Sequence, residues 1–148
     1  TRCPESNGPA ISEVNDDEKN EIMVSYYKDS MESSFTGIFN RDGHVQTLGW
    51  GSCQATSALA DLNDDGTDDI ITGCADDSIR AYDALDETLL WARQTEGPIN
   101  SSPAVGDIYP VEYGVEITFG NDASRVHLRE KDDGVSVDPW PYHIVPAT

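Results

Sequence analysis

The amino-acid sequence predicts an all-β protein built from repeated units of short strands, and three observations lead to that prediction. A small apolar segment, an acidic loop and a β-branched run follow one another three times along the chain. The alanines that open the three copies, Ala10, Ala58 and Ala104, are 48 and 46 residues apart. No segment of useful length shows the 3.6-residue apolar period of an amphipathic helix. A repeat of this length is typical of blade or solenoid architectures.

Each repeat is expected to contain about four strands, because turn signals separate short apolar or β-branched runs. Turns are indicated by Asp76–Ser78 in the second repeat, by Arg41–Gly43 in the first and by Lys131–Gly134 in the third. The expected strands are Pro9–Glu13, Glu21–Val24, Phe35–Asn40 and Val45–Leu48, then Ser57–Asp61, Asp69–Gly73, Ile79–Asp83 and Thr88–Ala92, then Pro103–Asp107, Glu116–Gly120 and Arg125–Arg129.

Four-stranded repeats of this length are what a β-propeller blade requires. We therefore interpret residues 1–148 as a single all-β repeat domain, with blade 1 at about 9–50, blade 2 at about 53–97 and blade 3 at about 100–145. Propellers close with roughly four to eight blades, so three blades form an incomplete ring or are assembled with other chains. The segment Asp138–His143 is expected to be a junction between blades. Blade faces left open at the two ends would expose apolar surface.

The charge of the chain is strongly negative. It has 28 acidic and 9 basic residues, for a formal net charge of −19. Such a surface repels nucleic acids and anionic membranes and attracts cations, although most of the acids are interpreted as a solvated surface. The sequence has no apolar run long enough to span a bilayer. The first residues, Thr1–Pro4, lack the apolar part of a signal peptide, which indicates that a signal was removed or that the chain begins inside a longer one.

The three cysteines indicate a disulfide rather than a zinc site. Cys53 and Cys74 flank a strand–loop–strand unit at comparable distances from its turn, and we predict that they are bonded, with two free buried thiols as the alternative. A disulfide implies an oxidising compartment. Cys3 is not part of this predicted bond, and its candidate partners are a cysteine of a missing segment or of another chain. Zinc is not expected, because there is no Cys-x-x-Cys and the three histidines are scattered.

The sharpest chemical signal is the acidic loop Asp61–Asp69 of the second repeat. Side-chain oxygens occur at its first, third, fifth and ninth positions, and Gly66 permits the positive φ of a tight turn. Calcium prefers several flexible oxygen ligands from the protein, so the loop predicts a calcium site; an acidic hairpin turn without metal is the alternative. It is not an EF-hand, because Thr72 stands where that motif has a glutamate. The predicted ligands are Asp61, Asn63, Asp65, Asp69 and the backbone carbonyl of Thr67.

The corresponding loops of the other repeats are predicted to bind metal weakly or not at all. The first has oxygen-bearing side chains in matching positions, but Glu18 replaces the glycine and Lys19 follows it. A non-glycine residue at positive φ costs roughly 1 kcal/mol, and the lysine adds a positive charge. The third keeps Asp107 and Glu116 but has Tyr109, Pro110 and Val111 between them. Metal binding is therefore expected in blade 2. In blade 1 a weak or vacant site is expected, at the positions Glu13, Asn15, Asp17 and Glu21.

The segment Ala58–Gly73 resembles an FG-GAP/VCBS repeat, as found in integrin α-subunit propellers and many secreted bacterial and archaeal proteins. Ser101–Asp107 is similar to the opening of such repeats. Ala81–Asp83 with Leu89–Trp91 resembles PQQ-like blades, in which the tryptophan docks one blade on the next. The resemblance implies a calcium-stabilised extracellular propeller used for adhesion, ligand display or scaffolding. It does not imply a quinone cofactor, because fold does not fix function.

No catalytic motif was found in the sequence. The leading hypothesis is a non-catalytic, extracellular, calcium-binding module with a structural, adhesive or self-assembling role, whose partners are other copies of itself or missing blades of a longer chain. The alternative is the propeller portion of a secreted carbohydrate-active enzyme such as a polysaccharide lyase; a quinone-dependent dehydrogenase fragment is a third. A carbohydrate or surface protein is a further candidate partner.

Asn100 opens a glycosylation sequon. Six aromatic residues are candidates for stacking on sugars, with packing between blades as the alternative role: Tyr26, Tyr27, Trp50, Tyr109, Tyr113 and Trp140.

Overall fold

The computed structural model describes residues 6–28, 33–109 and 114–144. They form twelve strands in three four-stranded antiparallel sheets, each with its strands in chain order across the sheet. These ranges contain no helix, and therefore no helix that is long and apolar enough to cross a membrane. The strands are β1 (Ser6–Ser12), β2 (Glu21–Lys28), β3 (Ser33–Asn40), β4 (Gly43–Gly51), β5 (Ala58–Ala60), β6 (Asp69–Gly73), β7 (Ser78–Tyr82), β8 (Leu89–Gln94), β9 (Ala104–Gly106), β10 (Glu116–Asn121), β11 (Arg125–Glu130) and β12 (Tyr142–His143).

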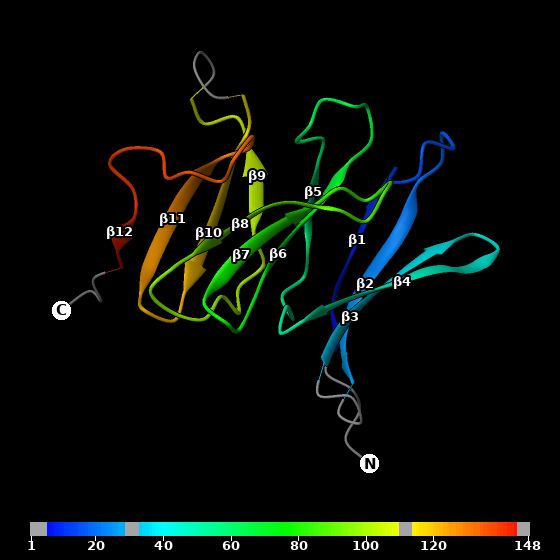
Figure 1. Ribbon diagram of the computed structural model, residues 1–148, viewed down its shortest axis with the longest axis horizontal. Coiled ribbons are helices and arrows are strands. Elements are labelled where there is room, and N and C mark those ends of the chain that lie inside the picture. Colours follow the sequence, from blue (N-terminus) through cyan, green and yellow to red (C-terminus); the bar gives the residue numbers. More distant parts are fainter. Residues whose placement is uncertain (1–5, 29–32, 110–113, 145–148) are drawn as a thin grey trace.

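The three sheets follow one another along the molecule, and they correspond to the three repeats. We call β1–β4 blade 1, β5–β8 blade 2 and β9–β12 blade 3. Figure 1 shows them side by side, with blade 2 in the middle. The all-β class predicted from the repeats and from the lack of helical periodicity is confirmed.

Alternation along the central strands of blade 2 explains how this sheet packs on both neighbours. Successive side chains of a strand point to opposite faces. Ile70 pairs with Tyr82 and packs with blade 1, whereas Ile71 pairs with Ala81 and packs with blade 3. Ile70 and Ile71 are both fully buried, and every residue of β6 is buried. Burying an isoleucine contributes about 1.5–3 kcal/mol, so one β-branched run stabilises both interfaces.

The interface between blades 1 and 2 is an apolar cluster closed by a disulfide. Met23, Ile38 and Leu48 of blade 1 pack in the same cluster as Ile70. Cys53, in the connection after β4, is bonded to Cys74, which directly follows β6. The bond therefore ties the link between the blades to the centre of blade 2.

The interface between blades 2 and 3 is built around Trp91 of β8. Its ring is 6% exposed and lies in one cluster with Ile117 and Phe119 of blade 3. Its indole Nε1 donates a hydrogen bond to the backbone carbonyl of Lys131 at 2.8 Å. Gly134, with a φ of 70°, comes so close that an added Cβ would lie 2.6 Å from the ring. The tryptophan thus joins the two blades through both packing and a polar contact.

The same interface contains a buried histidine next to arginines. His127 is 1% exposed, stacks on Phe119 with ring centroids 4.8 Å apart, and lies between Asn121 and Arg129. Burial lowers its pKa to about 4, helped by the charge of Arg129, while the carboxylate of Glu96 acts in the opposite direction. The imidazole is therefore neutral at physiological pH and packs as an aromatic ring.

The segment Asp138–His143 differs from its expected role. Instead of being only a junction, it delivers β12, whose Tyr142 and His143 pair with Val126 and Arg125 of β11. A strand of two exposed residues is too short for alternation to reveal it, and Pro139 and Pro141 argue against a strand by ordinary rules. The ladder of blade 3 is nevertheless completed to four strands.

His127 should make the protein sensitive to acid. In the unfolded chain the imidazole takes up a proton near its ordinary pKa of about 6.5, whereas in the folded chain it does so only near pH 4. Between these values the unfolded state binds more protons, so stability falls as the pH falls. We expect His127 to account for a loss of roughly 2 kcal/mol in unfolding free energy between about pH 7 and pH 4.5. Urea unfolding of wild type and His127→Gln at both pH values measures it; equal losses in the two proteins would contradict the assignment.

Candidate metal centre

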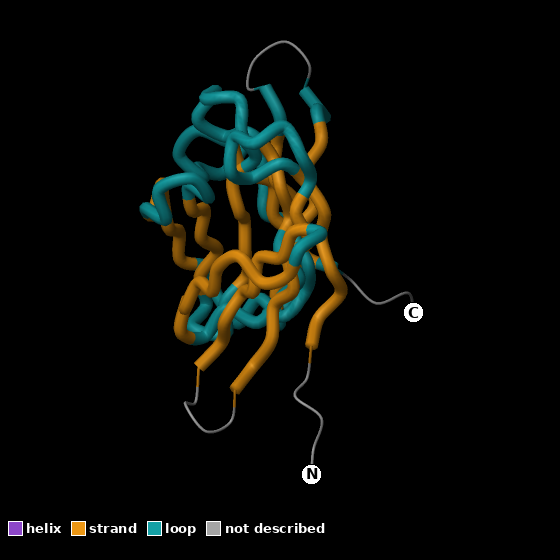
Figure 2. Tube along the Cα trace, turned by 90° about the vertical axis from the view of Figure 1, so that its right-hand side faces the viewer, coloured by secondary structure: helices purple, strands orange, loops and turns teal. Residues whose placement is uncertain are grey.

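The loops between the first and second strands of the three blades lie on one edge of the molecule. These are the β1–β2, β5–β6 and β9–β10 connections, at the upper edge in Figure 1. The side view in Figure 2 shows loops grouped at the ends of the strands, with the larger group at this upper end. Each of the three loops ends at an acidic residue that begins the second strand of its blade.

In the blade 2 loop, the predicted ligands fold back on the loop's own backbone. The Asp61 carboxylate accepts hydrogen bonds from the N–H groups of Asp65, at 3.1 Å, and Gly66, at 2.9 Å. Asn63 Oδ1 accepts from Asp65 N–H at 3.0 Å. The hydroxyl and N–H of Thr67 both donate to Asp65 Oδ1 and hold the pKa of Asp65 below its usual value. These hydrogen bonds thus hold the loop in one conformation and favour the ionised form of Asp65.

Asp69, at the end of this loop, is the unusual member of the set. It is fully buried; Oδ2 accepts from Leu62 N–H at 2.8 Å, and Oδ1 has no hydrogen-bond partner. Burial raises its pKa to about 6, against the Leu62 hydrogen bond, and the charges of Asp83 and Asp65 raise it further. A buried carboxylate oxygen without a partner is costly, and a bound cation would remove that cost.

Sequence reasoning missed the contribution of Asp83 to this site. Asp83 follows β7, accepts a hydrogen bond from Asn63 Nδ2 at 3.1 Å, and is one of the charges that act on Asp69. The acid lies 20 residues from Asn63 in the chain, so no loop pattern could assign it to the site. Its position adds negative charge where a cation would sit and orients the Asn63 amide with its oxygen toward the loop.

The blade 2 loop also contacts both neighbouring blades. Asp68 N–H donates to the backbone carbonyl of Glu13 at 3.0 Å, and the Ser12 hydroxyl donates to the Asp68 carboxylate. From blade 3, Lys131 Nζ donates to Leu62 O and to Asp64 Oδ2, each at 3.0 Å. The conformation of this loop therefore affects contacts with both blade 1 and blade 3.

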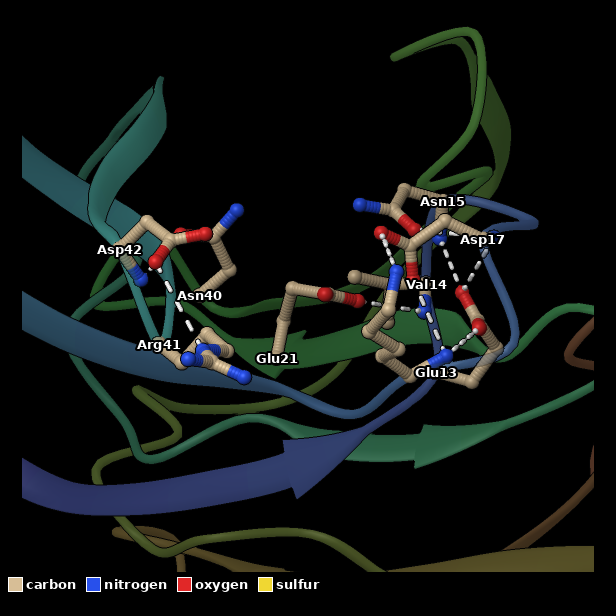
Figure 3. A network of polar contacts seen from close by, with 9 residues as sticks. Glu13, Val14, Asn15, Asp17, Glu21, Asn40, Arg41 and Asp42 are labelled. Carbon is tan, nitrogen blue, oxygen red and sulfur yellow. Dashed lines mark hydrogen bonds and ion pairs between the residues drawn. The ribbon is translucent and has the colours of Figure 1, made fainter.

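The carboxylates that lie closest together belong to blade 1 rather than blade 2. Oxygens of Glu13, Asp17 and Glu21, three of the positions that the sequence matched to the blade 2 ligands, lie within 4.8 Å of one another. Figure 3 shows Glu21 beside the loop that carries Glu13, Asn15 and Asp17, with its carboxylate directed toward that loop. A cleft of about 320 Å³ adjoins this loop, lined by Asp17, Lys19, Asn20, Asn40, Arg41 and Asp42.

Blade 3 has a buried acid at the corresponding position. Glu116 is fully buried, its Oε2 accepts from the N–H groups of Ile108 and Tyr109, and its Oε1 has no partner. No group of three carboxylates gathers around it in the described part of the chain. Pro110 and Val111 of this loop lie outside the described residues.

Two further predicted features are Asn100 and Cys3. Asn100 is exposed, and its Nδ2 donates to Asp122 Oδ2 at 2.9 Å, so glycosylation there would displace this contact. Cys3, whose partner was left open, lies outside the described residues.

Comparison with known proteins supports the fold. No family model and no curated protein matches the chain. Among solved structures, the crystal structure of BamB from Moraxella catarrhalis, a β-propeller, aligns with a TM-score of 0.54 and 13% sequence identity. The alignment covers 94% of this chain and 40% of BamB, so the chain spans well under half of that protein. The similarity confirms propeller-type blades and, at this identity, shows the fold alone.

Replacing Asp69 by asparagine should stabilise the metal-free protein and abolish its response to calcium. The folded pKa of about 6 lies above the ordinary 3.8, so ionising Asp69 at neutral pH opposes folding. An amide removes that charge, and we expect the unfolding free energy in chelator to rise by about 1–2 kcal/mol at neutral pH. Urea unfolding with and without calcium measures both effects. A variant that is destabilised in chelator would contradict this account of Asp69.

Proposed function

We propose that this chain is a non-catalytic, extracellular, calcium-binding β-propeller module with a structural, adhesive or self-assembling role. Calcium would bind the blade 2 loop through the side chains of Asp61, Asn63, Asp65 and Asp69 and the backbone carbonyl of Thr67. The observation that carries the proposal is the buried Asp69, whose Oδ1 has no partner at the end of a loop rich in oxygen ligands.

The chemistry of the donors favours calcium over other metals. The proposed ligands are carboxylate, amide and carbonyl oxygens, which hard cations prefer, and neither histidine nor cysteine contributes. Magnesium usually keeps several waters and demands strict octahedral geometry, whereas calcium accepts many protein ligands in a flexible arrangement. A calcium ion would also neutralise part of the charge that Asp65, Asp69 and Asp83 concentrate here.

A bracing role follows from the position of the loop. Its backbone receives contacts from Glu13 of blade 1 and from Lys131 of blade 3. A cation that rigidifies the loop would therefore hold three sheets, each of which is stabilised mainly by its neighbours. No reacting group is needed for such a role.

The extracellular assignment is supported by the Cys53–Cys74 disulfide and by the acidic surface. Disulfides persist in oxidising environments, and calcium is abundant outside cells, where modules typically bind it with dissociation constants of about 10⁻⁴–10⁻³ M. The net charge of −19 favours solubility and cation binding.

Stacking on further blades is supported by the outer face of blade 1. Ile11 and Ile22 pair across β1 and β2 on the face opposite Met23, and they are 62% and 43% exposed. Tyr26 and Phe35 stack on the same face with centroids 5.9 Å apart. In Figure 1 no described element covers this side of blade 1. An apolar sheet face of this kind suits another blade, from a second copy or from a longer chain.

Calcium should raise the thermal stability of the protein. A ligand that binds only the folded state at about 100 times its dissociation constant adds about 2.7 kcal/mol, which for a chain of this size is roughly 5–10 °C in Tm. Calorimetry in calcium and in chelator measures the shift. Asp65→Ala should reduce it, whereas Asp138→Ala, which removes an exposed acid far from the loop, should not. Identical shifts in wild type and Asp65→Ala would refute the blade 2 site.

The open face should make the chain associate in a concentration-dependent manner. Light scattering is expected to give a mass above the 16.1 kDa of one chain, because stacking buries the apolar face of blade 1. Ile22→Lys places a charge on that face and should return the mass to that of a monomer. Leu85→Lys, at a similarly exposed position in a turn of blade 2, is the control. A stable wild-type monomer at every concentration would rule out self-assembly.

A further inference from the structure

The β1–β2 loop of blade 1 concentrates negative charge that its own hydrogen bonds do not balance. Oxygens of Glu13, Asp17 and Glu21 all lie within 4.8 Å of one another. Glu21 is fully buried; its Oε2 accepts one long hydrogen bond from Val14 N–H at 3.4 Å, and its Oε1 has no partner. Figure 3 shows that this carboxylate is directed toward the loop. The protein therefore places a buried carboxylate that has one unpaired oxygen beside two further carboxylates.

The cluster is unfavourable without a cation. Burial raises the pKa of Glu21, and the charges of Asp17 and Glu13 raise it further, against the Val14 hydrogen bond. Glu13 remains ionised, because the N–H groups of Asn15, Lys19 and Asp17 lower its pKa despite some desolvation. Lys19 Nζ lies 3.3 Å from Asp17 Oδ2 on a side chain that is 67% exposed, so it screens the cluster from the solvent side.

The backbone of this loop follows that of the blade 2 loop. Asp16 and Glu18 have φ values of 59° and 61°, where Asp64 and Gly66 have 60° and 96°. Glu18 thus adopts the positive φ that was expected to weaken this loop. The hydrogen bonds also correspond: Asp17 N–H donates to Asn15 Oδ1, and Lys19 N–H donates to Asp17 Oδ1. The blade 1 loop therefore adopts this backbone conformation with a glutamate in place of the glycine.

Blade 3 provides an internal comparison. Glu116 is as buried as Glu21 and also has an unpartnered Oε1, so the buried acid alone is a common feature of the blades. The two additional carboxylates that reach the buried acid are found in blade 1. A divalent cation requires several oxygen ligands, with negative charge among them. A single buried acid does not provide such a set.

We propose that the β1–β2 loop is a second divalent-cation site, with Glu13, Asp17 and Glu21 as its charged ligands. The side-chain oxygen of Asn15 is a neutral ligand from the same loop. All donors are oxygens, so the site suits a calcium-sized hard cation that completes its coordination with water. Asp17 also lines the adjoining cleft of about 320 Å³, which gives the ion a path from solvent. Lys19 must leave Asp17 on binding, which its exposure allows.

Counting calcium ions per chain tests the site. Isothermal titration of the wild-type chain, stripped of metal with chelator, should give two calcium ions. Glu21→Gln should remove one of them, and Glu116→Gln, which changes the equally buried acid of blade 3, should leave both. Because Glu21→Gln could unfold the protein, the exposed Asp17→Asn is the second variant, and circular dichroism checks the fold of each. Lys19→Gln removes the competing charge and should tighten binding roughly threefold to tenfold.

The outcomes separate this site from that of blade 2. One ion that survives Asp65→Ala but is lost in Glu21→Gln and Asp17→Asn supports the blade 1 site and refutes the blade 2 site. One ion that is lost in Asp65→Ala and retained in folded Asp17→Asn overturns the present proposal and leaves the blade 2 site standing. Two ions in folded Glu21→Gln and Asp17→Asn also overturn it, and no ion in the wild type overturns both.

Discussion

Face-to-face packing of thin sheets is the constraint on which this structure depends. A four-stranded sheet is one layer thick, so each blade buries its apolar side chains only against a neighbouring blade. Blade 2 has neighbours on both faces, and its Ile70 and Ile71 are fully buried on opposite sides. Blade 1 has a described neighbour on one face only, which leaves Ile11 and Ile22 exposed on the other. The same alternation that forms the core therefore creates the open surface.

Buried acids at the ends of the three loops work against this packing. Glu21, Asp69 and Glu116 each begin the second strand of a blade, where the strand enters the stacked core, and each leaves one oxygen without a partner. Each also accepts a hydrogen bond from the N–H next to the first residue of its loop, which closes the loop. The acid thus shapes the loop at an electrostatic cost, and a bound cation would offset that cost where further carboxylates converge.

The sequence was sufficient for the strands because their signal is local. The β-branched run in Asp69–Gly73 and the recurring alanines depend on residues close in the chain, and the all-β repeat fold was predicted from them. The features that were missed depend on distant or conformational effects. Asp83 reaches Asn63 only after two strands pair, and Tyr142–His143 is too short to show a period. For the blade 1 loop, weak or absent metal binding stays a prediction; the structure shows that Glu18 takes up the positive φ, at a cost of roughly 1 kcal/mol, in a loop fixed by hydrogen bonds.

Burial distinguishes three acids, Glu21, Asp69 and Glu116, from the solvated carboxylates of this acidic chain. Most of the 28 acids can be hydrated where they stand, and their charge then costs little. Glu21 and Asp69 cannot be hydrated in this way, so a cation gains most by binding beside them. Because Glu13 O accepts the N–H of Asp68, the backbone joins the two loops that hold these acids. An ion in either loop would therefore stiffen the junction of blades 1 and 2, and with it the sheet whose other face exposes Ile11 and Ile22.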